Sequence, residues 1–268
     1  MYIKRLEIKN FRNYKELKID FNKNVNLILG NNAQGKTNLL ESIYLTSLGK
    51  SFRTNKDNEL IRFNEDGAYI KVEAIKEYLE NEIEIVINKS SKKSIKKDGV
   101  NLKKVSELLE NILIVIFSPE DLKIVKDEPE KRRKFIDREL CQIMPIYYDS
   151  LSNYKKALVQ RNVYLKEYNI DKNVLDLWDV QLAKYGAKII NIRKKFIDKI
   201  SVFSGAIHNN ITNGKENLYL KYNPNIKFIE GISEQEELFY DEIKKSLNND
   251  LKQRTTTKGP HKDDISFT

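Results

Sequence analysis

Residues 30–37 read Gly30-Asn31-Asn32-Ala33-Gln34-Gly35-Lys36-Thr37. The apolar run before them, residues 25–29, predicts a central strand buried on both faces. Residues 38–48, which follow, place apolar side chains on one face of a helix that Gly49 is suited to end. A Gly-x-x-x-x-Gly-Lys-Thr pattern between a strand and a helix is typical of a phosphate-binding loop.

Each fixed position of this loop has a physical reason. Gly30 and Gly35 let the backbone curl so that its N–H groups face an anion, and the helix N-terminus adds partial positive charge. Lys36 is predicted to bind the β- and γ-phosphates and to be the catalytic residue, and the Thr37 hydroxyl is predicted to bind Mg²⁺. We therefore expect all eight residues to bind a nucleotide.

Composition indicates a globular chain of 268 residues, of which 40% are hydrophobic. No apolar run approaches the roughly 20 residues that span a bilayer, and the N-terminus has no signal-peptide pattern, so we expect a cytoplasmic protein without a membrane partner. The single Cys141 excludes an internal disulfide framework or a cysteine-rich zinc site. The net charge of +9 fits an anionic partner, and it also fits a lysine-rich solvated surface.

The first part of the chain alternates apolar and polar residues with the period of β-strands. Strands are predicted at residues 3–10, 17–21, 68–75 and 82–88, and a further buried strand at residues 113–117. A lysine-rich segment with a turn at Asp98-Gly99 lies before the last of them, and it fits either contact with nucleic acid or a solvated loop. The candidate residues for contact with nucleic acid, which the resemblance described below specifies as DNA, are Lys92, Lys93, Lys96 and Lys97 of this segment, with Arg132 and Arg133 of a later basic run.

Helical periodicity dominates from Pro119 onward. The predicted helices span residues 130–144, 146–168, 174–211 and 234–251, with a strand at residues 217–222. The longest pattern predicts one long helix packed along a single seam. Near the end, His261, Asp263 and Asp264 fit a metal site or, more simply, a turn with solvated carboxylates.

Several blocks of the sequence carry a resemblance to known proteins. Leu6-Glu7-Ile8-Lys9-Asn10-Phe11-Arg12-Asn13-Tyr14, the loop and residues 38–43 together resemble the start of SMC-type ATPase heads. Later blocks resemble the RecF family of bacterial recombination mediators in particular, in order at residues 49–54, 117–122, 129–137, 160–162, 178–183 and 259–264. The resemblance covers essentially the whole chain.

Resemblance to the RecF family implies an α/β fold, with a P-loop ABC/SMC-type ATPase lobe and a second, mainly helical lobe. The expected boundaries are residues 1–117 for the N-terminal part of the ATPase lobe, 118–254 for the helical lobe and 255–268 for a return into the ATPase lobe. The resemblance also implies ATP and Mg²⁺ as cofactors. Arg12 and Asn13 are expected to contact the nucleotide, with an ordinary surface turn as the alternative.

The implied function is recombinational DNA repair and replication-fork maintenance, as part of the response to DNA damage. The protein is expected to form an ATP-dependent homodimer on gapped DNA or at junctions of single strand and duplex. Proteins of the RecO and RecR type are the implied partners in loading recombinase.

Two motifs of the family follow the block at residues 259–264, namely the ABC signature and the Walker B carboxylates, and neither occurs before Thr268. We therefore expect the chain to correspond to roughly the N-terminal three quarters of a RecF protein. The family implies weak, DNA-stimulated ATP hydrolysis. If nothing follows Thr268, we predict no useful hydrolysis by this chain alone.

Two alternatives come from other classes. A structural SMC-type head needs a much longer heptad insertion than any helical segment here. A P-loop kinase of a small acceptor leaves the basic charge unexplained.

Overall fold

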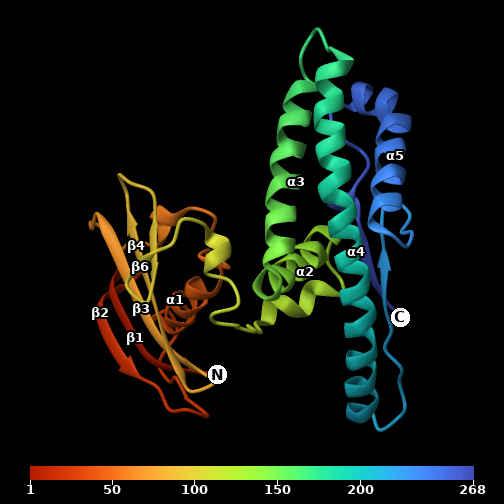
Figure 1. Cartoon of the computed structure of the whole chain (residues 1–268). Coiled ribbons are helices and arrows are strands. Elements are labelled where there is room, and N and C mark those ends of the chain that lie inside the picture. The colour runs from red at the N-terminus through yellow and green to blue at the C-terminus, as the bar shows by residue number, and fades with distance from the viewer. The chain divides into compact units, whose positions relative to one another are not determined.

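The computed structural model describes all 268 residues except the side chains of Pro119, Glu120 and Lys123, so part of the block at residues 117–122 lies outside the described residues. The chain divides into two compact units (Figure 1). Unit 1 holds Met1–Ile116 and Cys141–Pro145, and unit 2 holds Phe117–Leu140 and Ile146–Thr268. Unit 1 is built on a sheet and unit 2 mainly on helices, which confirms the predicted fold class.

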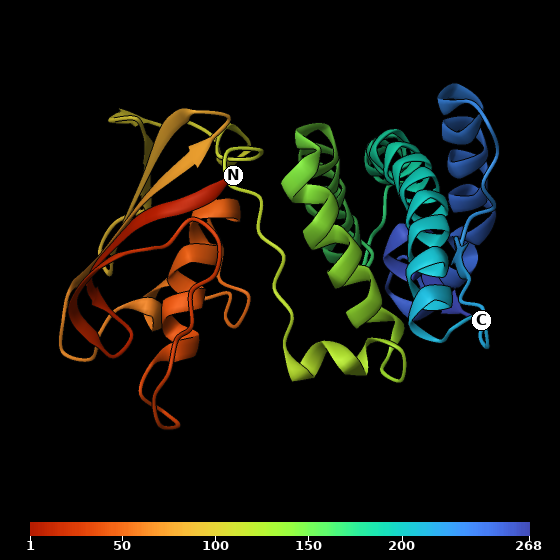
Figure 2. The same ribbon diagram turned by 90° about the horizontal axis from the view of Figure 1, so that it is seen from below.

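Unit 1 contains an antiparallel sheet of six strands in the order β2-β1-β3-β4-β5-β6. The strands are β1 (Tyr2–Phe11), β2 (Tyr14–Asp20), β3 (Gly67–Lys76), β4 (Leu79–Asn88), β5 (Ser94–Lys97) and β6 (Val100–Asn101). Helix α1 (Lys36–Leu48) lies on one face of this sheet in both views (Figures 1 and 2). The four alternating strands expected before residue 90 are confirmed, and Asp98 and Gly99 form the turn of the lysine-rich hairpin.

The core of unit 1 follows from the period of two along its strands. Leu6 and Ile8 on β1, Ile70 on β3 and Ile85 on β4 are fully buried and belong to one hydrophobic cluster. Residues between them point away from this cluster, as the alternating burial of β3 shows. The sheet therefore provides a rigid base for α1 and for the loop that precedes it.

Two predicted strands are wrong. Residues 25–29 and 113–117 form no strand in the described structure. Val25 is 82% exposed and Val115 is 88% exposed, so these apolar side chains face solvent. A central strand needs hydrogen-bonding partners on both edges, and every pairing in the described sheets involves other residues. Apolar character predicted burial, but it cannot supply a partner strand.

Unit 2 is a group of helices with a two-stranded sheet. Its elements are α2 (Pro129–Ile143), α3 (Pro145–Tyr164), α4 (Lys172–Ile211), α5 (Ile232–Gln253), β7 (Leu220–Asn223) and β8 (Asp264–Phe267), with α2 ending among the residues assigned to unit 1. The short 3₁₀ turns η3 (Pro119–Ile124) and η4 (Pro260–Lys262) also belong to unit 2, whereas η1 (Asp57–Leu60) and η2 (Val105–Glu107) belong to unit 1. Helices α3, α4 and α5 lie side by side in Figures 1 and 2. The predicted long helix is confirmed as α4.

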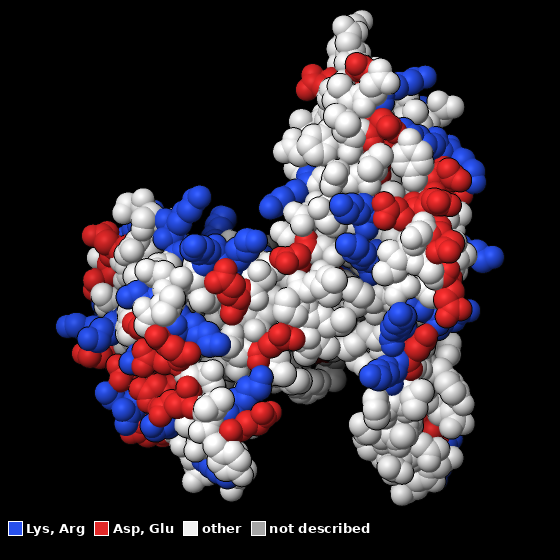
Figure 3. Space-filling model, in the orientation of Figure 1, with Lys and Arg blue, Asp and Glu red and all other residues white. Residues whose placement is uncertain are grey.

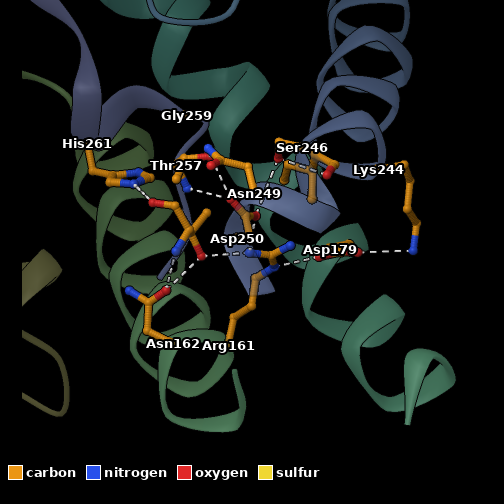
Figure 4. A network of polar contacts seen from close by, with 12 residues as sticks. Arg161, Asn162, Asp179, Lys244, Ser246, Asn249, Asp250, Thr257, Gly259 and His261 are labelled. Atoms are coloured by element: carbon orange, nitrogen blue, oxygen red, sulfur yellow. Dashed lines mark hydrogen bonds and ion pairs between the residues drawn. The ribbon is translucent and has the colours of Figure 1, made fainter. Parts of the chain in front are cut away.

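A buried ionic network joins these helices to the segment that follows α5 (Figure 4). The fully buried Arg161 of α3 donates hydrogen bonds to Asp179 of α4 (2.6 Å) and to Asp250 of α5 (2.7 Å). It also donates to Thr256 Oγ1 (2.8 Å), which ties the end of the chain to the helices. Because removing one partner of such a set leaves a buried charge unpaired, the network fixes how the three helices meet.

The end of the chain is packed into unit 2 rather than solvated. The Asp263 carboxylate is buried and accepts hydrogen bonds from Arg193 and Tyr222, while Asp264 pairs with Arg132. The interpretation of Asp263 as a solvated turn carboxylate is therefore wrong. In the described residues no group of three or more His, Cys, Asp or Glu side chains could hold a metal ion.

Candidate functional site

The phosphate-binding loop leads directly into α1. Gly35 is the N-cap residue with φ 104°, and a Cβ at this position would lie 2.7 Å from the side chain of Asn13, so glycine is required here. No described side chain caps α1, and its first turn has no acidic residue. The first N–H groups of α1 are therefore available to an anion, with the helix dipole in the favourable direction.

Lys36 folds back over this loop. Its ammonium group donates hydrogen bonds to the carbonyl oxygens of Gly30 and Asn31, both at 2.7 Å. Phosphate oxygens would offer this cation charged acceptors, which form stronger hydrogen bonds than neutral carbonyls. Thr37 is exposed next to it, at the start of α1, where its hydroxyl can reach a metal ion held by phosphates.

Asn13 lies against the loop and Arg12 against α1, while the expected contact of both residues with the nucleotide stays a prediction. Asn13 donates to the Gln34 carbonyl (3.1 Å) and accepts from Asn38 of α1 (2.8 Å). Arg12 has a left-handed backbone (φ 52°) in the turn that joins β1 to β2. Asn13 therefore supports the loop directly, whereas Arg12 bonds to Glu41 of α1 and to the Glu59 carbonyl.

Glu41 holds Arg12 in place, and sequence reasoning missed it. This fully buried carboxylate of α1 accepts two hydrogen bonds from Arg12 (2.7 and 3.0 Å) and others from Arg53 (3.2 Å) and Ser51 (2.5 Å). Burial alone would raise the pKa of Glu41, but the bonds from Arg12 and Ser51 hold that pKa below its ordinary value. Two of its partners, Ser51 and Arg53, lie in the block Gly49 to Thr54. Nothing in the sequence marked Glu41 as buried.

An open hollow of about 710 Å³ lies beside the loop. Its lining includes Arg12, Asn13 and Asn38, together with Arg62 and Phe63. Phe63 is 85% exposed, so the face of an aromatic ring is offered to whatever enters. The size fits a small-molecule site, and the arginines favour an anionic ligand with a planar group.

The candidate DNA-binding residues fall into two groups. Lys92 is exposed and Lys96 and Lys97 lie on β5, whereas Lys93 forms an ion pair with Asp57 of η1 (2.8 Å). These four belong to unit 1.

The two arginines belong to unit 2 and have partners within it. Arg132 is largely buried and pairs with Asp264 through both of its forked nitrogens (2.7 and 3.1 Å). Arg133 donates to the Asp263 carbonyl (2.6 Å). These contacts favour a structural role for both, which a basic run in the sequence could not reveal.

Comparisons with known proteins agree with this geometry. The family model "RecF/RecN/SMC N terminal domain" matches residues 2–165. The chain is 46% identical over 266 residues to the DNA replication and repair protein RecF of Clostridium botulinum, covering 99% of this chain and 72% of that protein. It is also 46% identical to RecF of Clostridioides difficile over 269 residues, covering 100% of this chain and 72% of that protein.

Two solved structures are similar over the whole chain. Both are described as the recombination mediator protein RecF in the RecFOR pathway, one with ATPrS and one with ATP. Their TM-scores are 0.95 and 0.90, each at 37% identity, and the chain covers 73% and 74% of them. A structural SMC head is the weaker alternative, because RecF proteins match from one end of this chain to the other. The chain belongs to the RecF family of DNA replication and repair proteins.

Proposed function

We propose that this chain binds ATP with Mg²⁺ at residues 30–37 and uses the bound nucleotide to control its hold on DNA during recombinational repair. The observation that carries the proposal is the Lys36 ammonium folded onto the loop at the uncapped start of α1. A helix N-terminus and a lysine that converge on one point suit a polyphosphate. The similar RecF structure with ATP supports the choice of nucleotide.

The remaining contacts orient the rest of the nucleotide. The loop N–H groups and Lys36 bind the β- and γ-phosphates, and the Thr37 hydroxyl binds Mg²⁺. The ribose and base enter the hollow, where Arg12 is held by Glu41 and the Phe63 ring offers a stacking face. Since Glu41 accepts both forked nitrogens of Arg12, that cation is pre-oriented before the nucleotide arrives.

The biological setting follows from the family. Two copies associate when ATP is bound and close on DNA with a single-strand gap or a junction between single strand and duplex. RecO- and RecR-type proteins act with them to load recombinase. On unit 1, Lys92 in the loop before β5 and Lys96 and Lys97 on β5 supply positive charge for the DNA backbone.

Lys36 provides the sharpest test of the nucleotide site. We expect Lys36→Met to weaken ATP binding at least tenfold (about 1.4 kcal/mol), because the charged partner of the phosphates is removed. The matched control is Lys15→Met, at an exposed position of β2, which should leave the affinity unchanged. Isothermal calorimetry with ATP and Mg²⁺ measures both.

The same variants separate binding from folding. The thermal midpoint of Lys36→Met without nucleotide should match that of the parent, because the side chain lies on the loop and not in the core. ATP should raise the midpoint of the parent and of Lys15→Met only. Equal ATP affinity in the parent and Lys36→Met would exclude the loop as the phosphate site.

A further inference from the structure

One side of α4 carries a row of lysines, of which Lys188 is half-buried and the other three are exposed: Lys184, Lys188, Lys195 and Lys199. Steps of four, seven and four residues place these side chains on one face of a helix, about 22 Å from first to last at 1.5 Å per residue. The opposite face holds the buried residues of α4, among them Ala183, Gly186 and Ile190. Figure 3 shows both blue and red side chains over the helical unit.

The lysine row stands out because it is not neutralised. In the described part of the chain none of its four ammonium groups forms an ion pair; Lys184 only lies near the ring of Tyr185. Neighbouring lysines behave differently, since Lys194 on another side of α4 pairs with Asp198 and Lys244 of α5 pairs with Asp176. Asp198 lies three residues after Lys195 and so borders the row, but its printed partner is Lys194.

The spacing of the lysine row also destabilises α4. Lys184 and Lys188 are four residues apart, as are Lys195 and Lys199, and like charges at this spacing repel and weaken a helix. None of the four contributes to the buried seam of α4. A polyanion laid along this face would relieve the repulsion at both pairs.

We propose that the lysine row of α4 binds the sugar-phosphate backbone of DNA, a role that rests on the proposed function but lies on a different unit from Lys92, Lys96 and Lys97. A duplex carries one negative charge per about 1.7 Å of its axis, so a row of this length meets several phosphates at once. Lysine ammonium groups act as point charges and bind phosphates. They lack the forked geometry by which arginine recognises bases. The binding is therefore independent of DNA sequence.

The test compares two variants with the same change of charge. In the row variant Lys184, Lys188, Lys195 and Lys199 are replaced by Gln. In the control variant four exposed lysines elsewhere in unit 2 are replaced by Gln: Lys166, Lys215, Lys221 and Lys252. Fluorescence anisotropy measures binding of the full chain to a gapped duplex, with ATP and Mg²⁺, at several salt concentrations and with two unrelated DNA sequences.

We expect the slope of log K against log salt to become shallower by about three to four units in the row variant, at roughly 0.9 for each phosphate that is no longer neutralised, equally for both sequences. In the control variant the slope should change by less than about one unit. Circular dichroism should show unchanged helix content in both. If the parent binds no DNA at any salt concentration, the proposed DNA function itself fails.

If the parent binds DNA and the row variant keeps its slope, the proposed function stands and the lysine row does not bind DNA. Binding to poly-glutamate provides a second arm. If the row variant no longer binds poly-glutamate while its DNA slope is unchanged, the face belongs to an acidic protein partner and the DNA assignment is overturned.

Discussion

Single residues of this chain act through partners that are far away in sequence. Glu41 is the centre of one such set, since Arg12, Ser51 and Arg53 all converge on its carboxylate. The lowered pKa of Glu41 means that this set stabilises the fold fully above the pKa of an unfolded glutamate. The stabilisation disappears as the pH falls through the lower, folded pKa.

We expect Glu41→Gln to lower the free energy of unfolding by about 1–3 kcal/mol, because a neutral amide leaves two arginines with weaker partners in a buried place. ATP affinity should also fall, since Arg12 loses the carboxylate that orients it. Urea unfolding and calorimetry measure the two effects. Glu16→Gln on the exposed face of β2 is the control, with an expected change below about 0.5 kcal/mol. A stability equal to that of the parent would show that Glu41 is not the organising group.

The side chain of His261 makes the stability of the fold depend on pH. Burial lowers its pKa to about 4, and its ring accepts from the Tyr154 hydroxyl while donating to the Thr256 carbonyl. Between pH 6.5 and 4 the unfolded chain protonates this residue and the folded chain does not, so stability falls as the pH falls through that window.

We expect His261 to contribute a decrease on the order of 3 kcal/mol across that window, at about 1.36 kcal/mol per unit of pKa difference. His261→Gln should remove this part of the slope, although it lowers stability at neutral pH. Unfolding curves at closely spaced pH values measure it. Parallel pH profiles for the parent and His261→Gln would contradict the assignment.

At the scale of elements, the seam between α4 and α5 depends on close approach. Gly186 of α4 faces the fully buried Phe239 of α5, and a Cβ on Gly186 would lie 2.3 Å from the phenyl ring. The ring is also in edge contact with Tyr154 of α3, at 6.5 Å between centroids. One missing side chain therefore lets three helices meet around one aromatic ring.

We expect Gly186→Ala to destabilise unit 2 by about 1–3 kcal/mol through overpacking, even though alanine favours an isolated helix by up to about 1 kcal/mol. Combining it with Phe239→Leu should recover part of this stability, because the smaller side chain makes room. Thermal unfolding of the two single variants and the double variant gives the coupling. Strict additivity would show that the two residues do not meet.

At the scale of the whole molecule, residues 25–29 and 113–117 leave most of their apolar side chains exposed, although Ile28 and Ile114 pack against the hydrophobic cluster of unit 1. Val25, Leu27 and Leu29 alternate along a segment without regular structure, each about four-fifths exposed at 82%, 80% and 79%. Apolar surface of this kind adds nothing to the stability of unit 1 and favours association. The predicted division of the chain, with residues 255–268 returning to the ATPase lobe, stays a proposal, and in this structure those residues contact the helices of unit 2.

We expect Leu27→Ser to change the free energy of unfolding by less than about 0.5 kcal/mol, because the substitution of an exposed side chain removes little buried apolar surface. Ile85→Ala in the core of the sheet should cost about 2–5 kcal/mol. Chemical denaturation measures both, and sedimentation should show less self-association for Leu27→Ser. A large drop in the stability of Leu27→Ser would mean that this segment is packed in solution.

Local patterns were sufficient for much of this protein. The phosphate-binding loop, the helix after it with its Gly49 stop, the alternating strands and the long α4 all depend on spacing within a few residues, which a sequence displays directly. Membership of the RecF family was likewise readable from short blocks in order.

The tertiary structure determined which residues distant in sequence contact one another. The burial of Glu41, the pairing of Arg132 with Asp264 and the burial of Asp263 join residues that are 10 to 132 positions apart. The absence of strands at residues 25–29 and 113–117 also depends on residues that are distant in sequence. A side chain shows whether it prefers to be buried, but its partner is chosen by where the rest of the chain folds.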